Sequence, residues 1–349
     1  MPTVDINLKD MEFDQIIGQE KVLKQVRSTL LVGRNLILVG PPGIGKTTLA
    51  KNVSSFLSDL DVVKGCEFHC TLNVLNCPSC ISKKNKGDKL EVETISGSKR
   101  FVRVQGSPDL TAEDLLGDID PIKALKFGPL SIEAFTPGKI FKANNGVLFF
   151  DELNRCPEKL QNALLQVLQE HEATIGSYSV NLPTNFVFIG TMNPEDYAGT
   201  EQLSSVFLDR FDLVYMGYPE SSEKELSIVS KNGKNLNIAF PSDLLHFAVE
   251  FVRSIRENKD VEQKPSVRAS LGLYERSQSN AIISGRKEVI FKDIQDSLIS
   301  VLRHRVTLKP SVRYLKDISV FLKEEFEKFV ESKPQFRKFA SEKEGSEAG

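Results

Sequence analysis

The sequence predicts an α/β domain built on a parallel sheet, followed by a smaller domain of helices only. Three observations carry this prediction. A glycine-rich loop joins an apolar strand to an amphipathic helix, a second apolar strand ends in two carboxylates, and only helical patterns follow Pro219. Strands that alternate with helices favour a parallel sheet, which binds ligands beyond the carboxyl ends of its strands. A chain of 349 residues is long enough for two domains.

Composition excludes several classes of protein. The net charge is −2, which gives no electrostatic case for binding nucleic acid or an anionic membrane. No apolar run reaches the length of a membrane span, and the first residues, MPTVDINLKD, do not form a secretory signal. We therefore expect a cytoplasmic protein without membrane contact, whose five cysteines do not form disulfides.

The glycine-rich loop reads GPPGIGKT and matches the phosphate-loop pattern G-x-x-x-x-G-K-[ST]. The strand Asn35–Gly40 precedes it and the helix Thr48–Leu57 follows it, as the binding mechanism requires. Glycines let backbone N–H groups approach phosphate oxygens, and the helix start adds its positive dipole end. Lys46 can reach the β- and γ-phosphates, and the Thr47 hydroxyl can ligate Mg²⁺. The predicted nucleotide-binding residues are Gly40, Pro41, Pro42, Gly43, Ile44, Gly45, Lys46, Thr47 and Thr48. The alternative is a glycine–proline turn that ends in Lys-Thr by chance.

Four of the five cysteines form a cluster in the sequence. Their spacing is C-x3-C-x6-C-x2-C, over Cys66, Cys70, Cys77 and Cys80. Two close pairs separated by a short loop can bring four thiolates to one tetrahedral Zn²⁺. His69 could replace one cysteine, an iron–sulfur cluster could use the same four residues, and four unrelated thiols are the alternative to any metal. We expect a structural role, followed by a solvated loop at Lys83–Lys89 that forms the tip of a hairpin.

The second apolar strand, Val147–Phe150, runs directly into Asp151 and Glu152. Asp151 lies where a carboxylate can hold Mg²⁺, and Glu152 lies where it can polarise the attacking water as a general base. A carboxylate pair about a hundred residues after a phosphate loop is a strong combination. The alternative is a pair that caps the next helix.

Three further polar residues are predicted to complete the site. Asn193 follows the apolar strand Asn185–Thr191, where its side chain can hydrogen-bond the attacking water or the γ-phosphate. Arg210 lies in LDRFD and can stabilise phosphoryl charge from a neighbouring subunit, although a structural Arg–Asp pair is the alternative. Arg268 opens a predicted helix, where a cation is unfavourable unless an anion is bound nearby. The alternatives are a turn residue for Asn193 and a surface arginine for Arg268.

Hydrophobic periodicity and turn residues predict the remaining segments. Residues 107–143 read as a loop, a short helix and a turn-rich insert. Residues 173–182 read as a hairpin around Gly176-Ser177. Helical patterns cover residues 223–231, 243–256, 266–279 and 292–303 in the second domain. One more amphipathic helix is predicted over Val312–Val330, and disorder over Ser341–Gly349.

The motifs GPPGIGKT, VLFFDELNR, GTMNPEDYAGT, LDRFD and PSVRAS, in this order and spacing, resemble the MoxR and magnesium-chelatase branch of AAA+ ATPases. Ile16-Ile17-Gly18-Gln19 resembles the lead-in near the adenine in such proteins. DIDPIKALKFG and FTPGKIFKANNG resemble the helix-2 insert of the chelatase ATPase subunit, and GCEFHC…CPSC resembles a cysteine-bearing segment of chelatase-like ATPases. HEATIGSYSVNLP is closer to MoxR, and the helix beyond Lys309 has no clear match. The resemblance covers roughly residues 10 to 305.

The resemblance implies roles for individual residues. Lys46 and Thr47 bind phosphate and Mg²⁺, Asp151 and Glu152 form the Walker B pair, and Asn193 is sensor 1. Arg210 matches the arginine finger that acts in trans, and Arg268 matches sensor 2. Arg155 belongs to the D-E-x-N-R of the family and lies near the subunit interface.

The resemblance also implies a domain layout and a function. It implies an AAA+ core with a helix-2 insert over residues 1–218 and a helical lid over 219–308; the sequence pattern adds a C-terminal helix with a disordered tail over 309–349. Within the core, residues 66–80 form the cysteine insert and residues 107–143 the helix-2 region. We expect an ATP-hydrolysing, usually hexameric ring that remodels a partner protein with a von Willebrand A (VWA) domain. The alternatives are the ATPase subunit of a magnesium or cobalt chelatase, a nucleotide-gated scaffold and, least, a DNA motor.

Overall fold

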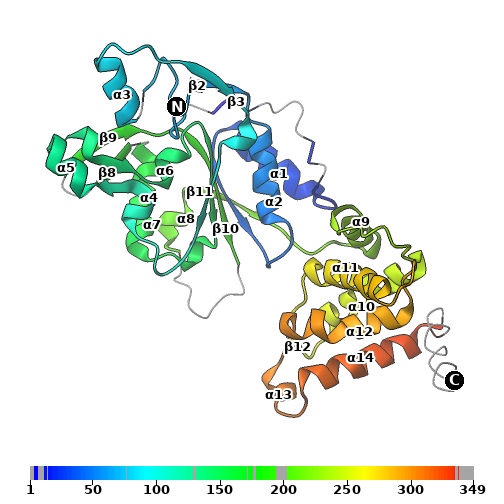
Figure 1. Ribbon diagram of the computed structural model, residues 1–349. Coiled ribbons are helices and arrows are strands. Elements are labelled where there is room, and N and C mark those ends of the chain that lie inside the picture. The colour runs from blue at the N-terminus through cyan, green and yellow to red at the C-terminus, as the bar shows by residue number, and fades with distance from the viewer. Residues whose placement is uncertain are drawn as a thin grey trace. The chain divides into compact units, whose positions relative to one another are not determined.

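The computed structural model describes most of the chain. The described residues are 4–6, 12–13, 15–75, 77–128, 131–170, 172–175, 178–193, 203–334 and 337. Packing divides the chain into two compact units. The first unit comprises Met1–Asp14, Gln19–Pro41 and Gly45–Met216, and the second comprises Gln15–Gly18, Pro42–Ile44 and Gly217–Gly349. The predicted class is confirmed, because a parallel sheet flanked by helices is followed by a helical unit (Figure 1).

The first unit is built on a five-stranded sheet whose strands all run parallel. Its order is β11-β1-β10-β7-β4. The strands are β1 (Asn35–Val39), β4 (Phe101–Gln105), β7 (Gly146–Asp151), β10 (Phe186–Met192) and β11 (Phe211–Tyr215). The apolar residues of β1 and β7 are buried, as expected of strands covered on both faces. Because the strands are parallel, their carboxyl ends lie along one edge, and Gln105 pairs in register with Asp151 there.

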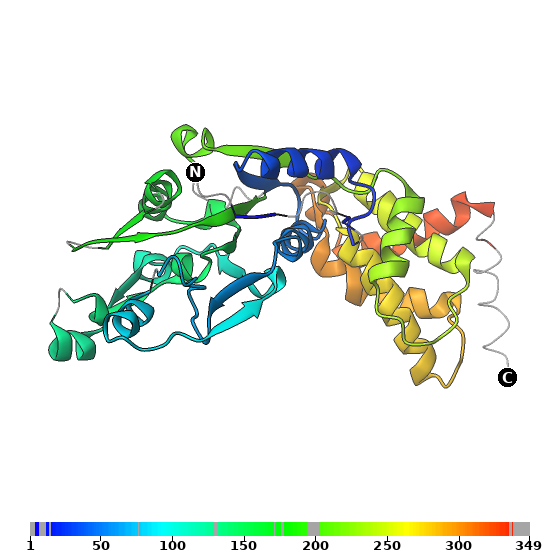
Figure 2. The same cartoon turned by 90° about the horizontal axis from the view of Figure 1, so that it is seen from above.

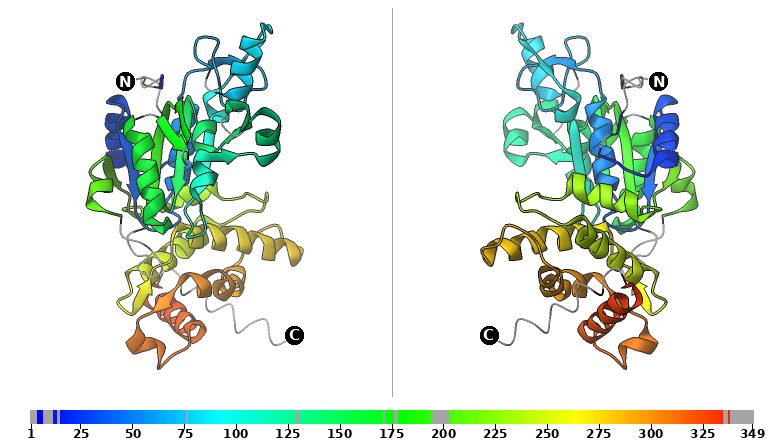
Figure 3. Two further views of the ribbon diagram at one scale, coloured as in Figure 1. Left: turned by 90° about the vertical axis from the view of Figure 1, so that its left-hand side faces the viewer. Right: turned by 90° about the vertical axis from the view of Figure 1, so that its right-hand side faces the viewer.

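Helices lie against both faces of this sheet (Figure 3). They are α1 (Glu20–Leu31), α2 (Lys46–Ser55), α6 (Lys139–Lys142), α7 (Glu158–Glu170) and α8 (Ser205–Leu208), with the 3₁₀ turns η1 (Gly97–Lys99) and η3 (Leu153–Arg155). The helix α1 packs against β1 and β11, whereas α2 packs against β7. Apolar side chains from α7 and the neighbouring strands form one buried cluster, including Leu160, Leu164 and Phe188. This cluster fixes the strand ends that carry the polar residues.

Several small elements project from the core between β1 and β7. The strands β2 (Leu60–Val63) and β3 (Val92–Ile95) form an antiparallel pair, and the stretch of chain that connects them carries the cysteine segment and α3 (Pro78–Asn85) (Figures 1 and 2). The next elements are α4 (Ala112–Leu116), β5 (Gly117–Ile119), α5 (Pro121–Phe127), η2 (Ile132–Ala134) and β6 (Phe135–Pro137). Both α3 and α5 pack against η2. The strands β5 and β6 pair with each other, which the sequence pattern did not indicate.

Two local expectations in this unit have different outcomes. The loop expected over Lys83–Lys89 is wrong at its start, because α3 continues to Asn85. Cys77 caps this helix and Pro78 occupies its first turn, which is a favourable helix start. The expected hairpin is confirmed by the pairing of β8 (Glu172–Ile175) with β9 (Tyr178–Pro183). Gly176 and Ser177 lie outside the described residues.

The second unit is mainly helical. Its elements are α9 (Ser222–Asn232), α10 (Ser242–Glu257), α11 (Val267–Ile283), α12 (Phe291–Leu302), α13 (Pro310–Arg313) and α14 (Ile318–Ser332), with η4 (Arg303–Arg305) and the small pair β12 (Val261–Gln263) and β13 (Thr307–Leu308). Edge-to-face contacts between Phe247, Phe251 and Phe326 join α10 to α14.

The single helix expected over Val312–Val330 is wrong. The chain forms the short α13 and then a new helix at Ile318, because Asp317 caps this second start. Its carboxylate accepts a hydrogen bond of 2.7 Å from the Ser319 N–H. The disorder expected over Ser341–Gly349 falls outside the described residues. No helix in the described part of the chain has both the length and the apolar character needed to cross a membrane.

A buried carboxylate joins three helices of the second unit. Glu225 of α9 is 0% exposed and receives two hydrogen bonds from Arg256 of α10, at 2.8 and 3.0 Å. The Ser270 hydroxyl of α11 donates to the same carboxylate at 2.6 Å. Burial by itself raises the pKa of Glu225, but the hydrogen bonds and charges of Arg256, Ser270 and Arg253 outweigh it, so the pKa lies below its usual value.

Replacing this carboxylate is expected to destabilise the second unit in a pH-dependent way. Glu225→Gln leaves buried Arg256 without its counter-ion, which costs about 3–5 kcal/mol of unfolding free energy at neutral pH. Because folding lowers the pKa of Glu225, its stabilising contribution is present above the unfolded value of about 4.3 and is lost as the pH falls through the folded value. Chemical denaturation of both proteins between pH 7 and pH 3.5 measures this difference, which should shrink in acid.

Glu220→Gln is the matched control. Glu220 forms an exposed pair with Lys224, at 3.2 Å, so its loss should change stability by less than about 0.5 kcal/mol. Equal stability of the two variants at neutral pH would contradict the importance of the Glu225 cluster.

Candidate functional site

The phosphate loop connects β1 to α2. Gly43 and Gly45 have φ values of 74° and 98°, which favour glycine, and Gly45 directly precedes the first turn of α2. The Lys46 ammonium lies inside the loop and donates to the carbonyl oxygens of Gly40 and Pro41, at 2.5 and 2.9 Å. The Thr47 and Thr48 side chains start from the first turn of the helix. A helix start preceded by left-handed glycines, with a lysine turned into the loop, fits the binding of phosphate groups.

The predicted carboxylate pair lies at the carboxyl end of β7. One oxygen of Asp151 accepts a hydrogen bond from the Thr191 hydroxyl at 2.6 Å, and the other forms an ion pair with Arg103 at 2.6 Å. Glu152 has a left-handed backbone, with φ of 55°, and its N–H donates to the Thr191 oxygen at 2.9 Å. The β10 residue Thr191 therefore holds the backbone and one carboxylate of the pair at fixed positions.

The Glu152 carboxylate is held by two neighbours. One oxygen accepts from the Gln105 amide at 2.9 Å and lies 3.3 Å from Nη1 of Arg155. Gly106, the residue after Gln105, lies directly against the Glu152 backbone. A Cβ on Gly106 would be 2.1 Å from the Glu152 carbonyl oxygen. Only glycine fits this approach between the two strand ends. The carboxylate that is expected to act as a base is thus bound to an amide and a guanidinium in this state.

The other predicted residues lie on different elements. Asn193 directly follows β10, the strand between β1 and β7, and its carbonyl oxygen accepts from the Asn154 amide at 3.4 Å. The structure therefore brings the ends of β1, β10 and β7 side by side, with the phosphate loop, Asn193 and the carboxylates on neighbouring strands. Pro194, the next residue in the motif, lies outside the described residues.

Arg210 lies between α8 and β11. Its guanidinium donates to the Val206 carbonyl oxygen, and the Gln169 side chain, with its oxygen turned toward Arg210, accepts two hydrogen bonds of 2.6 Å. Asp212 of the same LDRFD segment pairs instead with Arg34, at 2.9 Å, and accepts from Thr29. Arg210 is therefore oriented by neutral groups, which differs from the structural Arg–Asp pair considered from the sequence.

Arg268 lies in the first turn of α11, which Ser266 caps. The second unit also takes in Pro42–Ile44. Within this unit, two side chains approach Gly43 closely. If Gly43 carried a Cβ, that atom would lie 2.6 Å from the Ser266 hydroxyl oxygen and 3.2 Å from Cδ of Arg268. Within the second unit, the start of α11 therefore lies against Gly43.

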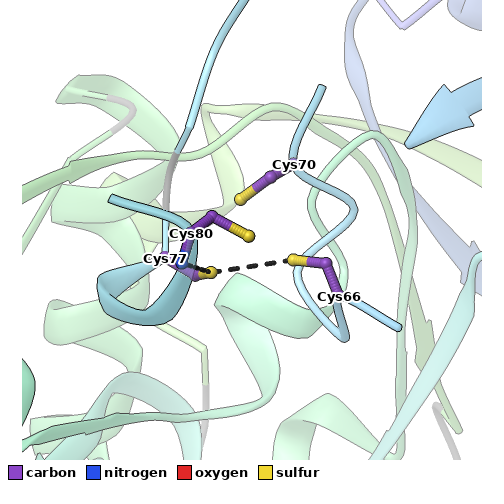
Figure 4. Close-up of side chains that lie close together, drawn as sticks. All are labelled: Cys66, Cys70, Cys77 and Cys80. Atoms are coloured by element: carbon purple, nitrogen blue, oxygen red, sulfur yellow. Dashed lines mark hydrogen bonds between the residues drawn. The ribbon is translucent and has the colours of Figure 1, made fainter. Parts of the chain in front are cut away.

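The four predicted cysteines converge (Figure 4). Their sulfur atoms all lie within 4.8 Å of one another, and those of Cys66 and Cys77 are 3.7 Å apart. A tetrahedral Zn²⁺ with Zn–S bonds of about 2.3 Å has sulfur–sulfur distances of about 3.8 Å, so the group fits this ion. Hydrogen bonds from Cys70 and Cys77 lower the pKa of the Cys66 thiol to about 2, which favours the thiolate that ligates metals. Burial raises the pKa of Cys80.

His69 does not belong to this group. Its Nδ1 lies 2.8 Å from the Asn144 carbonyl oxygen, and burial lowers its pKa. The Asn144 and Asn145 side chains donate to the backbone of Phe68 and His69, at 3.1 and 3.2 Å. The cysteine segment is therefore attached to the residues that directly precede β7, at the opposite end of the strand from Asp151.

Sequence reasoning missed three contributors to the site: Arg103, Gln105 and Thr191. The alternation of FVRVQ places Arg103 and Gln105 on one face of β4, which was recognised as a strand but not as the neighbour of β7. The signal in the sequence was the presence of two polar side chains, Arg103 and Gln105, in a strand that is otherwise apolar. Thr191 was included in the β10 strand without a role.

Three sequence families match consecutive parts of the chain. Residues 12–86 match "Magnesium chelatase, subunit ChlI", residues 86–213 match "ATPase family associated with various cellular activities (AAA)", and residues 253–317 match "AAA lid domain". The chain belongs to the AAA+ ATPases, in the branch of MoxR and magnesium chelatase. This AAA+ protein is therefore an ATPase that uses ATP and Mg²⁺, and the resemblance stated from the sequence is confirmed.

Its curated relatives come from both sides of that branch. A magnesium-chelatase subunit ChlI homolog of Methanocaldococcus jannaschii is 26% identical over 333 residues, covering 85% of this chain and 86% of the relative. The chaperone MoxR1 of Mycobacterium tuberculosis is 26% identical over 323 residues, covering 84% and 73%. YeaC of Bacillus subtilis is 29% identical over 238 residues, covering 61% and 71%.

Solved structures share the AAA+ fold at low identity. A magnesium-chelatase complex of subunits BchI and BchD gives a TM-score of 0.50 at 19% identity, covering 87% of this chain and 98% of the other. NtrX of Brucella abortus in complex with ADP gives a TM-score of 0.51 at 15% identity, covering 89% of this chain and 61% of the other. These similarities concern the fold alone.

Proposed function

We propose that this AAA+ ATPase forms a ring, of six subunits as the family resemblance implies, in which ATP hydrolysis remodels or activates a partner protein. The observation that carries the proposal is the arrangement at one edge of the sheet, where the phosphate loop, Asn193 and the Asp151–Glu152 pair follow the ends of neighbouring strands. Arg210 lies apart from them, directly before β11, the strand beyond β1. An arginine held away from the carboxylates of its own chain suits action on a neighbour's nucleotide.

The roles proposed for individual residues follow from this edge. Lys46 and the loop N–H groups bind phosphate oxygens, and Thr47 with Asp151 holds Mg²⁺, which would neutralise phosphate charge. Glu152 accepts the proton of the attacking water, and Asn193 orients that water. Arg210 of one subunit and Arg268 at the start of α11 stabilise the charge that develops on the transferred phosphoryl group.

The surface of the insert supports an interaction with a partner protein. On α5, Ile122 and Leu125 are 80% and 91% exposed, and Phe127 is exposed beside them. Lys123 and Lys126 lie on the same short helix. Large apolar side chains gathered on one exposed helix indicate a contact surface rather than a solvated one. We propose that this helix contacts the partner, and that the partner carries a VWA domain as the family resemblance implies.

Two roles share this mechanism. A MoxR-type chaperone activates another protein complex, whereas a chelatase-type ATPase subunit drives insertion of magnesium or cobalt into a tetrapyrrole. The segment HEATIGSYSVNLP, which forms the β8–β9 hairpin, resembles MoxR and favours the chaperone role. The resemblance of the insert to chelatase, and the similarity to the ChlI homolog, support the second role. A third role, a scaffold that binds nucleotide without hydrolysing it, is less favoured because the chain belongs to a family of ATPases.

Removing the proposed base should separate hydrolysis from binding. We expect Glu152→Gln to lower kcat by about 10²–10⁴-fold while the protein still binds ATP, because the amide cannot accept the proton of the attacking water. Steady-state ATPase assays and binding of a fluorescent ATP analogue measure the two effects. Normal turnover would rule out the base assignment.

The same variant tests the proposed partner. A Glu152→Gln ring held in ATP should retain a VWA-domain protein that a Lys46→Ala ring, which lacks the phosphate contact, releases. Retention by both variants would show that the interaction does not depend on ATP.

Mixing two inactive variants tests whether Arg210 acts in trans. Arg210→Ala and Lys46→Ala should each be inactive, but in a mixed ring a site between the two variants can contain both intact residues. Equal mixing leaves about one quarter of the sites complete, because half of the nucleotide-binding sides and half of the arginine-donating sides are intact. ATPase activity across mixing ratios measures the recovery. Activity that stays absent at every ratio contradicts a trans role.

We also propose that Cys66, Cys70, Cys77 and Cys80 hold one structural Zn²⁺. The protein should contain about one zinc per chain by elemental analysis, and Cys77→Ser should lose it because a tetrahedral site needs all four ligands. Cys156→Ser is the matched control, since Cys156 is buried elsewhere in the core. If the protein instead contains iron and absorbs visible light, the same cysteines hold an iron–sulfur cluster. If it contains neither zinc nor iron, the proposed metal site is wrong.

A further inference from the structure

Arg103 lies where the metal is expected, and its contacts have no role in the scheme above. Its Nη2 lies 2.6 Å from Oδ2 of Asp151, and the Thr191 hydroxyl occupies the other oxygen of that carboxylate. The side chain of Asp151 is only 14% exposed, whereas that of Arg103 is 51% exposed. The guanidinium therefore covers the carboxylate oxygen that Thr191 does not contact and, being half-exposed, can leave toward solvent.

The same guanidinium is linked to the proposed base. Nη2 of Arg103 also donates to the Gln105 side-chain oxygen at 3.0 Å, and the nitrogen of that amide donates to Glu152 at 2.9 Å. Arg103 and Gln105 alternate on one face of β4, and Gln105 pairs in register with Asp151. One arginine thus contacts the proposed metal ligand directly and the proposed base through a single amide.

Electrostatics makes the position of Arg103 depend on the metal. A guanidinium and a divalent cation repel each other when both lie within a few ångströms of one carboxylate oxygen. Without the metal, Arg103 neutralises Asp151 and prevents an uncompensated, largely buried charge. With the metal, the attraction between Arg103 and Asp151 is replaced, and the exposed arginine gains hydration by leaving.

We propose that Arg103 is a positioning residue that substitutes for Mg²⁺ at Asp151 and leaves when the metal–nucleotide complex binds. Its departure removes the contact that orients Gln105 and so loosens the hold of Gln105 on Glu152. Arrival of the metal is thereby coupled to release of the base. This inference rests on the proposed assignment of Asp151 to Mg²⁺.

The test measures ADP binding, which requires no hydrolysis. In Arg103→Ala, Mg²⁺ no longer competes with a guanidinium, so the half-saturating Mg²⁺ concentration for binding a fluorescent ADP analogue should fall roughly three- to tenfold. In EDTA the affinity for the same analogue should stay within about twofold of wild type, because Arg103 contacts a carboxylate rather than phosphate. Arg103→Lys, which retains the charge with fewer donors, should be intermediate.

Two controls isolate the effect. Arg34→Ala removes an arginine of the same unit that pairs with Asp212, so it should leave the Mg²⁺ dependence unchanged. In an Asp151→Asn background, Arg103→Ala should no longer change the half-saturating Mg²⁺ concentration. If Asp151→Asn leaves the Mg²⁺ dependence intact, the metal assignment itself fails.

Other outcomes overturn the inference directly. An unchanged or higher half-saturating Mg²⁺ concentration in a folded Arg103→Ala protein shows that the arginine does not compete with the metal. Weaker ADP binding in EDTA assigns Arg103 to the phosphate instead. Circular dichroism and the thermal midpoint of each variant establish that it is folded.

Discussion

The parallel arrangement of the sheet is the constraint on which the other features of the first unit depend. Five strands run in one direction, so their carboxyl ends lie along a single edge, and the apolar residues of β1 and β7 are buried on both faces. A strand that slipped by one residue would turn its buried side chains to the opposite face. Burial therefore fixes the register, and the register fixes the positions of the loop, Asn193 and the Asp151–Glu152 pair. The polar residues of the site are therefore positioned by the packing of apolar strand residues that precede them in the chain.

The features that were predictable from the sequence are those whose signal is local. A phosphate loop between a strand and a helix, and an apolar strand that ends in Asp-Glu, each lie within about ten consecutive residues. The cysteine spacing is local too, and the four thiols do converge. Helix boundaries were less accurate where a cap decided them, as at Cys77 and Asp317. The charged composition of residues 83–89 indicated a loop in the first place, and periodicity indicated one continuous helix in the second.

The features that were missed depend on which strands are neighbours. Arg103 and Gln105 precede Asp151 by more than forty residues, and their importance appears only when β4 pairs with β7. The same is true of Asn144 and Asn145, which bind a segment some seventy-five residues earlier. The Glu225 cluster likewise joins α9 to α10 and α11. A single sequence records neither strand order nor the partners of a buried charge.

The cysteine segment enters and leaves the core at one place. Val63 and Val92 are register partners at the ends of β2 and β3, so the chain between them starts and finishes at neighbouring positions. Asn144 and Asn145 fasten it at the start of β7, roughly 20 Å along that strand from Glu152. An element joined in this way is modular. It can differ in length and ligands between related proteins, or be exchanged for a tight turn by engineering, while the strands that carry the nucleotide chemistry keep their register.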